Sequence, residues 1–279
     1  MFHPHKPKSQ RNQVLTLLVA TACALGLVGC SDSTPPKKAP SAAASSRTTK
    51  APANTPSPSS TQVNASPLAG KTIVIDPGHG IGRQLTNPVP DGRGGSKICN
   101  TSGTATNAGY PEHTFTWQVA DYLRTQLQEK GASVVMTRNN DTSAEICVDR
   151  RGQIPKEQGA AALISIHGNG SPSSAPHGFF VMISDPPLNA AQGEPSRQLA
   201  RAVSAGLQGT GLTPSTIFGA EPVSRSDLAT LNFAQVPAVM VELGEMRNPE
   251  DAQRMSNPEG QQQYATGLAQ GILSFFSAR

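Results

Sequence analysis

The chain has 279 residues and a formal net charge of +4, but this charge is unevenly distributed. Residues 1–68 carry seven of the 23 basic residues and one of the 19 acidic ones, which leaves 16 basic and 18 acidic residues in 69–279. Nucleic-acid binding needs clustered Lys and Arg on the binding surface, so this slightly acidic remainder argues against a nucleic-acid partner.

The N-terminus has the pattern of an export signal. Basic residues precede an apolar run over 14–28 that is short for a membrane span and typical of a signal peptide. The run ends in Leu27-Val28-Gly29-Cys30, which resembles a bacterial lipobox. We therefore expect residues 1–29 to be a lipoprotein signal peptide and Cys30 to be lipidated. The alternative is an ordinary secretory signal in which Cys30 is incidental, and both interpretations predict export.

A stretch of Ser, Thr, Ala and Pro follows, with almost no large apolar residues, and it predicts a disordered linker over 30–69. After removal of the leader and lipidation of Cys30, Cys99 and Cys147 are the two cysteines left. Two cysteines in an exported domain usually pair, so we expect a disulfide between them. Neither has a Cys or His neighbour at zinc-finger spacing.

Residues 70–279 show strand and helix patterns in alternation. Short apolar runs predict strands at 71–76, 132–137, 161–166, 177–184 and 237–243, and helical spacing predicts helices at 114–130, 143–158, 196–207 and 259–276. Residues 81–109, rich in Gly, Asn, Ser, Thr and Pro, predict a long loop. The alternation favours a single α/β domain with a mostly parallel, mixed central sheet flanked by helices.

Polar side chains follow the predicted strands where these end. His79 comes just after the first strand, His167 directly after the third, and Glu242 near the end of the last. Carboxyl ends of parallel strands meet at one edge of a sheet, where two imidazoles and carboxylates can hold zinc and leave a position for water. Taken singly, a His at a strand end is more often structural, and a Glu in an apolar run is more often half of a buried ion pair.

Four ordered motifs resemble the zinc-dependent N-acetylmuramoyl-L-alanine amidases of the amidase-3 family, over about residues 70–276. They are Lys71-Thr-Ile-Val-Ile-Asp-Pro-Gly-His79-Gly with Glu112 opening a later helix, Val-Val-Met-Thr-Arg138, Leu-Ile-Ser-Ile-His167-Gly-Asn169, and Pro237-Ala-Val-Met-Val-Glu242-Leu-Gly244. The resemblance implies that His79, Glu112 and His167 bind one zinc ion and that Glu242 is catalytic. It also implies hydrolysis of the amide between the lactyl group of N-acetylmuramic acid and L-alanine of the peptidoglycan stem peptide.

The sequence departs from the family pattern beside this site. Glu245 and Met246 follow Leu-Gly where the family often has Phe, and Gly168 stands where it often has Ala; both changes bear on substrate fit. His113 is a competing ligand next to Glu112, but neighbours on a helix point about 100° apart, so one should face away, and Glu112 is preferred. We interpret His177 as structural.

Two arginines and one loop have open roles. Arg138 and Arg150 could pair with substrate carboxylates, but structural ion pairs are the favoured interpretation. The predicted loop over 81–109 lies between two proposed ligands, and Cys99 would tether it. We therefore hypothesise that it is a lid over the substrate groove.

The expected partners are peptidoglycan or muramyl-peptide fragments and, through the lipid anchor, the membrane facing the cell wall or periplasmic space, with a monomer as the default. Two rivals remain open from the sequence. One is a non-catalytic peptidoglycan-binding or hydrolase-regulating lipoprotein, and the other is a zinc peptidase that cuts elsewhere in the stem peptide.

Overall fold

The computed structural model describes residues 66–80, 82–142 and 146–279. The predicted signal peptide, Cys30 and most of the predicted linker lie outside these residues. The last residues of the predicted linker, 66–69, belong to the fold, and Leu68 is fully buried in the main core. The folded part therefore begins a few residues before position 70. Leu68 is a single large apolar residue in a polar stretch, so the sequence pattern does not indicate that it is buried.

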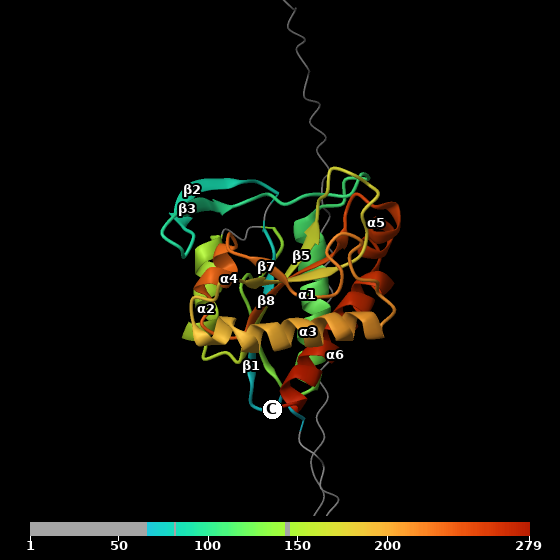
Figure 1. Ribbon diagram of the computed structural model, residues 1–279. Helices are drawn as coiled ribbons and strands as arrows, with labels where there is room; N and C mark the ends of the chain where they lie inside the picture. The colour runs from blue at the N-terminus through green and yellow to red at the C-terminus, as the bar shows by residue number, and fades with distance from the viewer. Residues whose placement is uncertain (1–65, 81, 143–145) are drawn as a thin grey trace, which may run out of the picture. The chain divides into compact units, whose positions relative to one another are not determined.

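A six-stranded mixed sheet forms the centre of the domain, in the order β4-β1-β5-β8-β6-β7 (Figure 1). The first four strands are parallel: β4 (Ser133–Met136), β1 (Thr72–Pro77), β5 (Ala162–Asn169) and β8 (Ala238–Glu245). β6 (Phe180–Ser184) pairs antiparallel with β8, and β7 (Val223–Arg225) pairs parallel with β6. The predicted α/β fold with a mostly parallel mixed sheet is confirmed.

Helices cover both faces of the sheet, which explains why the strands are apolar on both sides. On one face α1 (Glu112–Glu129), α3 (Glu194–Gly209) and α6 (Pro258–Ser277) enclose the main core. On the other face α2 (Val148–Glu157) and α4 (Ala229–Phe233) cover a smaller core. The remaining helices are the 3₁₀ turn η1 (Ala190–Gln192) and α5 (Pro249–Met255). Among the described residues, no helix has both the length and the apolarity to cross a bilayer.

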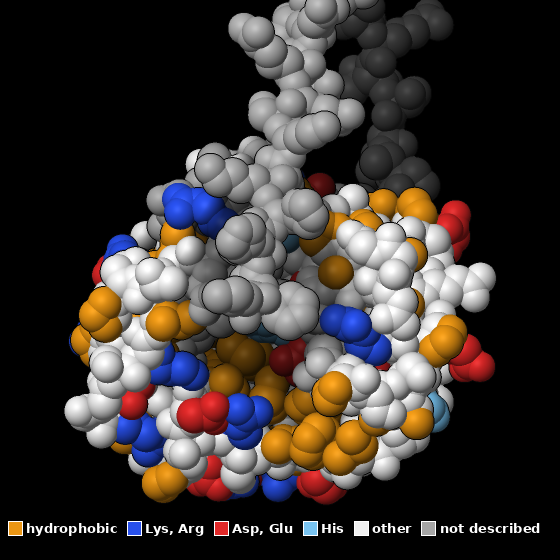
Figure 2. Space-filling view, turned by 90° about the horizontal axis from the view of Figure 1, so that it is seen from above, with side chains coloured by type: hydrophobic (Ala, Val, Ile, Leu, Met, Phe, Trp, Pro, Cys, Tyr) orange, Lys and Arg blue, Asp and Glu red, His pale blue; other side chains and the backbone are white. Residues whose placement is uncertain are grey.

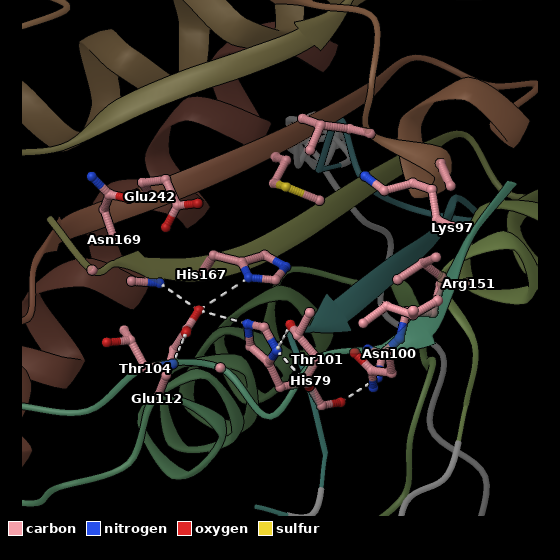
Figure 3. A pocket seen from close by; sticks show the side chains of 18 residues that line it. His79, Lys97, Asn100, Thr101, Thr104, Glu112, Arg151, His167, Asn169 and Glu242 are labelled. Atoms are coloured by element: carbon pink, nitrogen blue, oxygen red, sulfur yellow. Dashed lines mark hydrogen bonds and ion pairs between the residues drawn. The ribbon is translucent and has the colours of Figure 1, made fainter. Parts of the chain in front are cut away.

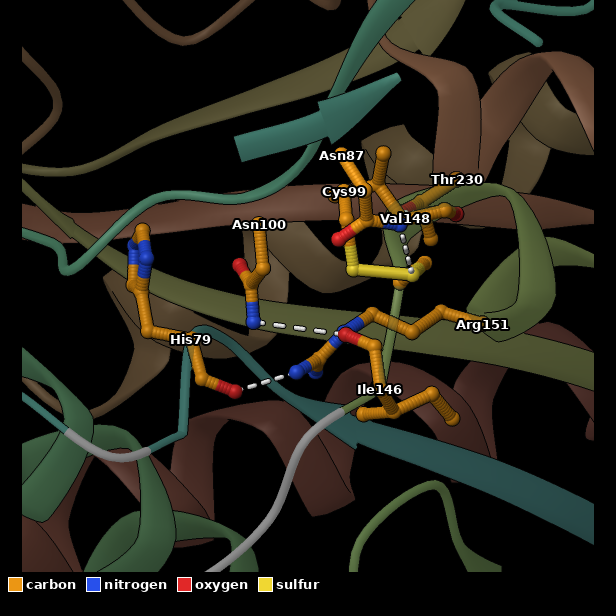
Figure 4. Close-up of a disulfide and its surroundings, with 9 residues drawn as sticks. His79, Asn87, Cys99, Asn100, Ile146, Val148, Arg151 and Thr230 are labelled. Atoms are coloured by element: carbon orange, nitrogen blue, oxygen red, sulfur yellow. Dashed lines mark hydrogen bonds between the residues drawn. A yellow bond between two sulfur atoms is a disulfide. The ribbon is translucent and has the colours of Figure 1, made fainter. Parts of the chain in front are cut away.

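The prediction of a structureless loop over 81–109 is wrong in part. This segment contains an antiparallel hairpin of β2 (Leu85–Pro90) and β3 (Ser96–Asn100), whose turn is fixed by Asp91 accepting the N–H groups of Arg93 and Gly95. The predicted disulfide is confirmed: Cys99 in β3 is bonded to Cys147, the residue before α2, with an S–S distance of 2.06 Å (Figure 4). The disulfide fastens the hairpin to the domain beside the carboxyl ends of the strands.

Candidate metal centre

The turn after β1 places His79 against His167. His79 has a φ of 60°, an uncommon conformation for a residue with a side chain, and Gly78 precedes it. A Cβ at Gly78 would lie 2.3 Å from Cε1 of His167, so only glycine allows the two segments to approach this closely. The two imidazole rings meet edge to face, with centroids 4.9 Å apart.

Arg151 of α2 supports this turn from below. Its Nη1 lies 2.7 Å from Oδ1 of Asp76 and donates to the carbonyl of Pro77 at 2.8 Å. Figure 4 shows the third contact, in which Nη2 donates to the carbonyl of His79. Both side chains of the ion pair are buried. Burial opposes the charged form of Asp76, but Arg151 and hydrogen bonds from Ser165 and Thr137 outweigh it and lower the pKa of that carboxyl. No local pattern in the sequence indicates that Arg151 is buried beneath this turn.

Glu112, the first residue of α1, lies between the two histidines. Its Oε1 is 3.0 Å from Nε2 of His79 and 3.1 Å from Nδ1 of His167 (Figure 3). The same oxygen accepts the N–H of Gly168 at 3.1 Å, and Oε2 accepts the N–H of Thr104 at 2.9 Å. One ligand atom from each of the three side chains lies within 4.8 Å of the others, so the predicted ligands are brought together as a group that can hold a metal ion.

His113, the competing ligand next to Glu112, faces away from the site, as the geometry of a helix predicts. Nδ1 of His113 lies 2.9 Å from Oδ1 of Asp141, away from the three grouped side chains. On the other side of the site, Nδ1 of His79 lies 3.0 Å from the carbonyl of Thr101, which accepts a hydrogen bond from it. That contact leaves Nε2 of His79 as the free ligand nitrogen facing Glu112.

Burial and mutual attraction set the charges of this group. Burial disfavours the imidazolium of His79, but Glu112 outweighs burial and raises the pKa of His79. Burial lowers the pKa of His167 despite its hydrogen bond to Glu112. The two histidines outweigh burial and lower the pKa of Glu112, which keeps this carboxylate ionised. Two imidazoles and an ionised carboxylate are the donor set of many catalytic zinc sites, so these residues fit zinc.

Glu242 occupies the next strand over, at the position of β8 that pairs with His167. Burial, together with the charges of Glu112 and Glu245, raises the pKa of Glu242 well above its usual range. Its Oε2 is buried, and among the described residues no group bonds to it. A buried carboxyl with a raised pKa and a free oxygen is suited to taking up and releasing a proton.

These side chains open into a cavity of about 410 Å³. Its walls include Lys97, Ile98 and Asn100 of the hairpin, Leu228 and Ala229 where α4 begins, and Met240 of β8. Figure 2 looks down on this part of the molecule and shows a hollow flanked by apolar side chains, with an acidic side chain inside it. The hairpin thus forms one wall of the cavity, and its role as a movable lid stays a prediction.

The other polar residues singled out from the sequence are Arg138, Arg150 and His177. Arg138 is buried and binds Asp141 at 3.0 Å and the carbonyl of His113 at 2.6 Å. Arg150 is exposed and pairs with Glu157. His177 is bonded through its main chain to Thr216 and precedes β6, which begins at Phe180 and not at His177 as predicted. The predicted ion pairs of Arg138 and Arg150 are confirmed, whereas a structural role for the His177 side chain stays a prediction.

The fold and these contacts define a class of protein: an α/β domain of the metal-dependent hydrolase type, in which two histidines and a glutamate that can hold one metal ion meet at the carboxyl-end edge of the parallel strands. Comparison with known proteins gives the family. The family model for amidase-3, N-acetylmuramoyl-L-alanine amidase, matches residues 73–274. This chain belongs to that family.

Relatives of known name agree with this assignment. The chain is 43% identical over 234 residues to the N-acetylmuramoyl-L-alanine amidase Rv3717 of Mycobacterium tuberculosis, a match that covers 81% of this chain and 95% of the relative. Among solved structures, the amidase Ami1 of Mycobacterium smegmatis superposes with a TM-score of 0.74 at 42% identity, covering 76% of this chain and 99% of the other. Ami1 of Mycobacterium abscessus gives a TM-score of 0.72 at 47% identity, covering 74% and 99%.

Proposed function

We propose that this chain is a zinc-dependent N-acetylmuramoyl-L-alanine amidase that hydrolyses the amide between the lactyl group of N-acetylmuramic acid and L-alanine. The grouping of His79, Glu112 and His167 around one point, with Glu242 on the adjacent strand, carries the proposal. These three residues would hold one zinc ion. When bound, zinc lowers the pKa of a water molecule and polarises the amide carbonyl.

Glu242 would act as the general base and then as the general acid in this reaction. Its carboxylate accepts a proton from the attacking water as the new C–O bond forms at the carbonyl carbon. It then passes that proton to the L-alanine nitrogen as the C–N bond breaks, because an amine anion is a poor leaving group. The products are a lactyl carboxylate and a peptide with a free amine. The raised pKa of Glu242 suits it to hold the proton between the two transfers.

The Cys99–Cys147 disulfide supports the proposal that the protein works in an oxidising, exported location. The predicted lipidation of Cys30 would anchor it to the membrane, facing the cell wall or periplasmic space. A linker of about 40 residues has a root-mean-square reach near 35 Å, so an anchored catalytic domain over residues 70–279 could search nearby wall as a monomer.

Cleavage of a defined muramyl peptide tests the proposal. Purified protein is incubated with the substrate, with and without a chelator, and the product masses identify the bond that is cut. A chelator-sensitive split between the lactyl group and L-alanine supports the amidase. Chelator-sensitive cleavage elsewhere in the stem peptide would establish the zinc peptidase instead, and binding without any product would establish the non-catalytic lipoprotein.

A further inference from the structure

Asn169 brings an uncommitted hydrogen-bond acceptor to the proposed reaction centre. It ends β5 two residues after His167, it is half-buried, and it lines the cavity together with Glu242. Figure 3 shows the side chains of Asn169 and Glu242 beside each other at one end of the pocket. Among the described residues, no group donates to the side-chain oxygen of Asn169, so this oxygen is available to a ligand.

The orientation of the Asn169 amide is fixed by Glu245, a carboxyl with no exposed surface. Oε1 of Glu245 accepts the Asn169 side-chain NH₂ at 2.7 Å, and Oε2 accepts the N–H of Ser171 at 3.2 Å. An ionised carboxylate can only accept hydrogen bonds, so the NH₂ group must face Glu245. The amide oxygen is therefore held on the opposite side.

The backbone around Asn169 is also fixed. The N–H of Gly168 donates to Glu112 at 3.1 Å, and the carbonyl of Asn169 accepts the N–H of Met246 at 2.8 Å. A Cβ at Gly170 would lie 2.7 Å from Oγ1 of Thr104, so the chain is pressed against the loop that carries Thr104. The side-chain oxygen of Asn169 consequently belongs to a rigid segment that also contacts Glu112, a proposed metal ligand. A group that positions a substrate needs such rigid support.

We propose that the side-chain oxygen of Asn169 accepts the N–H of the scissile amide, and that buried Glu245 keeps this oxygen turned toward the substrate. The inference rests on the proposed function. Glu242 delivers its proton to the scissile nitrogen, so an acceptor beside Glu242 faces the same nitrogen. The bond strengthens when Glu242 transfers its proton to that nitrogen, because the nitrogen then carries a positive charge until the C–N bond breaks, and this favours the transition state over the bound substrate.

Replacement of Glu245 by Gln should turn the Asn169 amide around, so that its NH₂ group faces the pocket in place of its oxygen. The N–H of Ser171 is a donor only, so the oxygen of the introduced amide must turn toward it, and the introduced NH₂ group then faces Asn169. The Asn169 amide must flip in response, which places its NH₂ in the pocket opposite a substrate N–H. Glu245→Gln should therefore act on the scissile N–H through Asn169, and this effect should vanish once Asn169 is gone. The substitution also removes a charge near Glu242, and that effect does not depend on the scissile N–H.

Two substrates test the inference: the muramyl peptide, and its depsipeptide analogue in which oxygen replaces the scissile nitrogen. Asn169→Ala should lower kcat/KM for the amide about 10- to 100-fold and change that for the ester by less than about threefold. Glu245→Gln should lower the amide-to-ester ratio of kcat/KM by a similar factor, and adding it to Asn169→Ala should not lower this ratio further. Glu250→Gln, the same change at an exposed position of α5, is the control. Zinc content and thermal unfolding are recorded for every variant.

Equal losses on amide and ester with Asn169→Ala would overturn the inference, as would a further fall of the amide-to-ester ratio from Glu245→Gln in the Asn169→Ala background. If the wild type does not turn over the ester, the double-variant comparison is made with the amide at the plateau of the pH–rate profile. If Glu245→Gln does not fold, the amide-to-ester ratio of Asn169→Ala decides. Failure of the wild type itself to cleave the lactyl amide would instead remove the proposed function, so the two failures are distinguishable.

Discussion

Arg151 and Asp76 form a buried ion pair, with Nη1 and Oδ1 2.7 Å apart, directly beneath the turn that presents His79. Arg151 also donates to the carbonyl of His79, so the pair connects the centre of the sheet to one of the proposed zinc ligands. The positive φ of His79 is maintained by this contact and by the glycine before it. Stability of the core and geometry of the site therefore depend on the same arginine.

Arg151→Met should lower both stability and zinc affinity. The change leaves the Asp76 carboxylate buried without its charge partner, and breaking a buried pair in this way costs about 3–5 kcal/mol. Urea unfolding of the chelator-treated protein and zinc titration measure the two effects. Arg150→Met, one residue away but exposed, is the matched control and should change little. Equal behaviour of the two variants would contradict the supporting role of Arg151.

The Asp76 carboxyl should make stability depend on pH in the acidic range. Its pKa is lower in the folded protein than the ordinary value of about 3.9, so its stabilising contribution is complete above that value. The contribution is lost as the pH falls through the folded pKa. With zinc removed, the free energy of unfolding of the wild type should therefore fall more steeply below about pH 4 than that of Asp76→Asn. Parallel curves for the two proteins would contradict this assignment.

Gly78→Ala should damage the site while leaving the rest of the fold in place. The added Cβ would overlap the His167 ring at 2.3–2.6 Å, and this ring is held between Glu112 and His79, so one ligand must move. We expect zinc affinity to fall at least about tenfold, the range seen when the support of a ligand is disturbed. Gly82→Ala is the control, because its Cβ would meet only the edge of His113 at 3.5 Å. Unchanged zinc affinity in Gly78→Ala would show that the turn tolerates the methyl group.

Much of the site could be predicted because its residues follow strong local patterns. The strand that precedes His79 and the strands that contain His167 and Glu242 are apolar and rich in β-branched residues, and their ends mark one edge of a parallel sheet. Glu112 could be assigned only through the family resemblance, and the angle of about 100° between helix neighbours then separated it from His113. For the two histidines and Glu242, local sequence and the general geometry of α/β sheets point to the same edge of the sheet.

The missed features depend on long-range contacts. The strands of the hairpin are short and polar, and β2 contains Pro88 and Pro90, so neither shows the alternation of an ordinary strand. Arg151 follows Arg150 in a helix without a clear apolar face, so the sequence does not reveal which of the two is buried. Glu245 stood out as a departure from the family pattern, but its partner Asn169 became evident only from the pairing of β5 with β8.

Removal of the Cys99–Cys147 disulfide should destabilise the domain and loosen the hairpin. The bond closes a loop across a separation of 48 residues, and on the chain-entropy model its loss costs about 4 kcal/mol. The Cys99→Ala/Cys147→Ala protein should unfold at lower denaturant concentration, and amide hydrogen exchange in β2 and β3 should become faster than in the central sheet. Protection of the hairpin equal to that of the wild type would show that its other contacts suffice to hold it.

Zinc content, measured beside amide cleavage in three proteins, tests the central claim most directly. The wild type should hold one zinc ion per chain and release the stem peptide from the lactyl group. Glu242→Gln should hold the same zinc and lose several orders of magnitude in rate, whereas His167→Ala should lose both zinc and activity. Full zinc occupancy in His167→Ala, or undiminished cleavage by Glu242→Gln, would contradict the roles assigned to these residues.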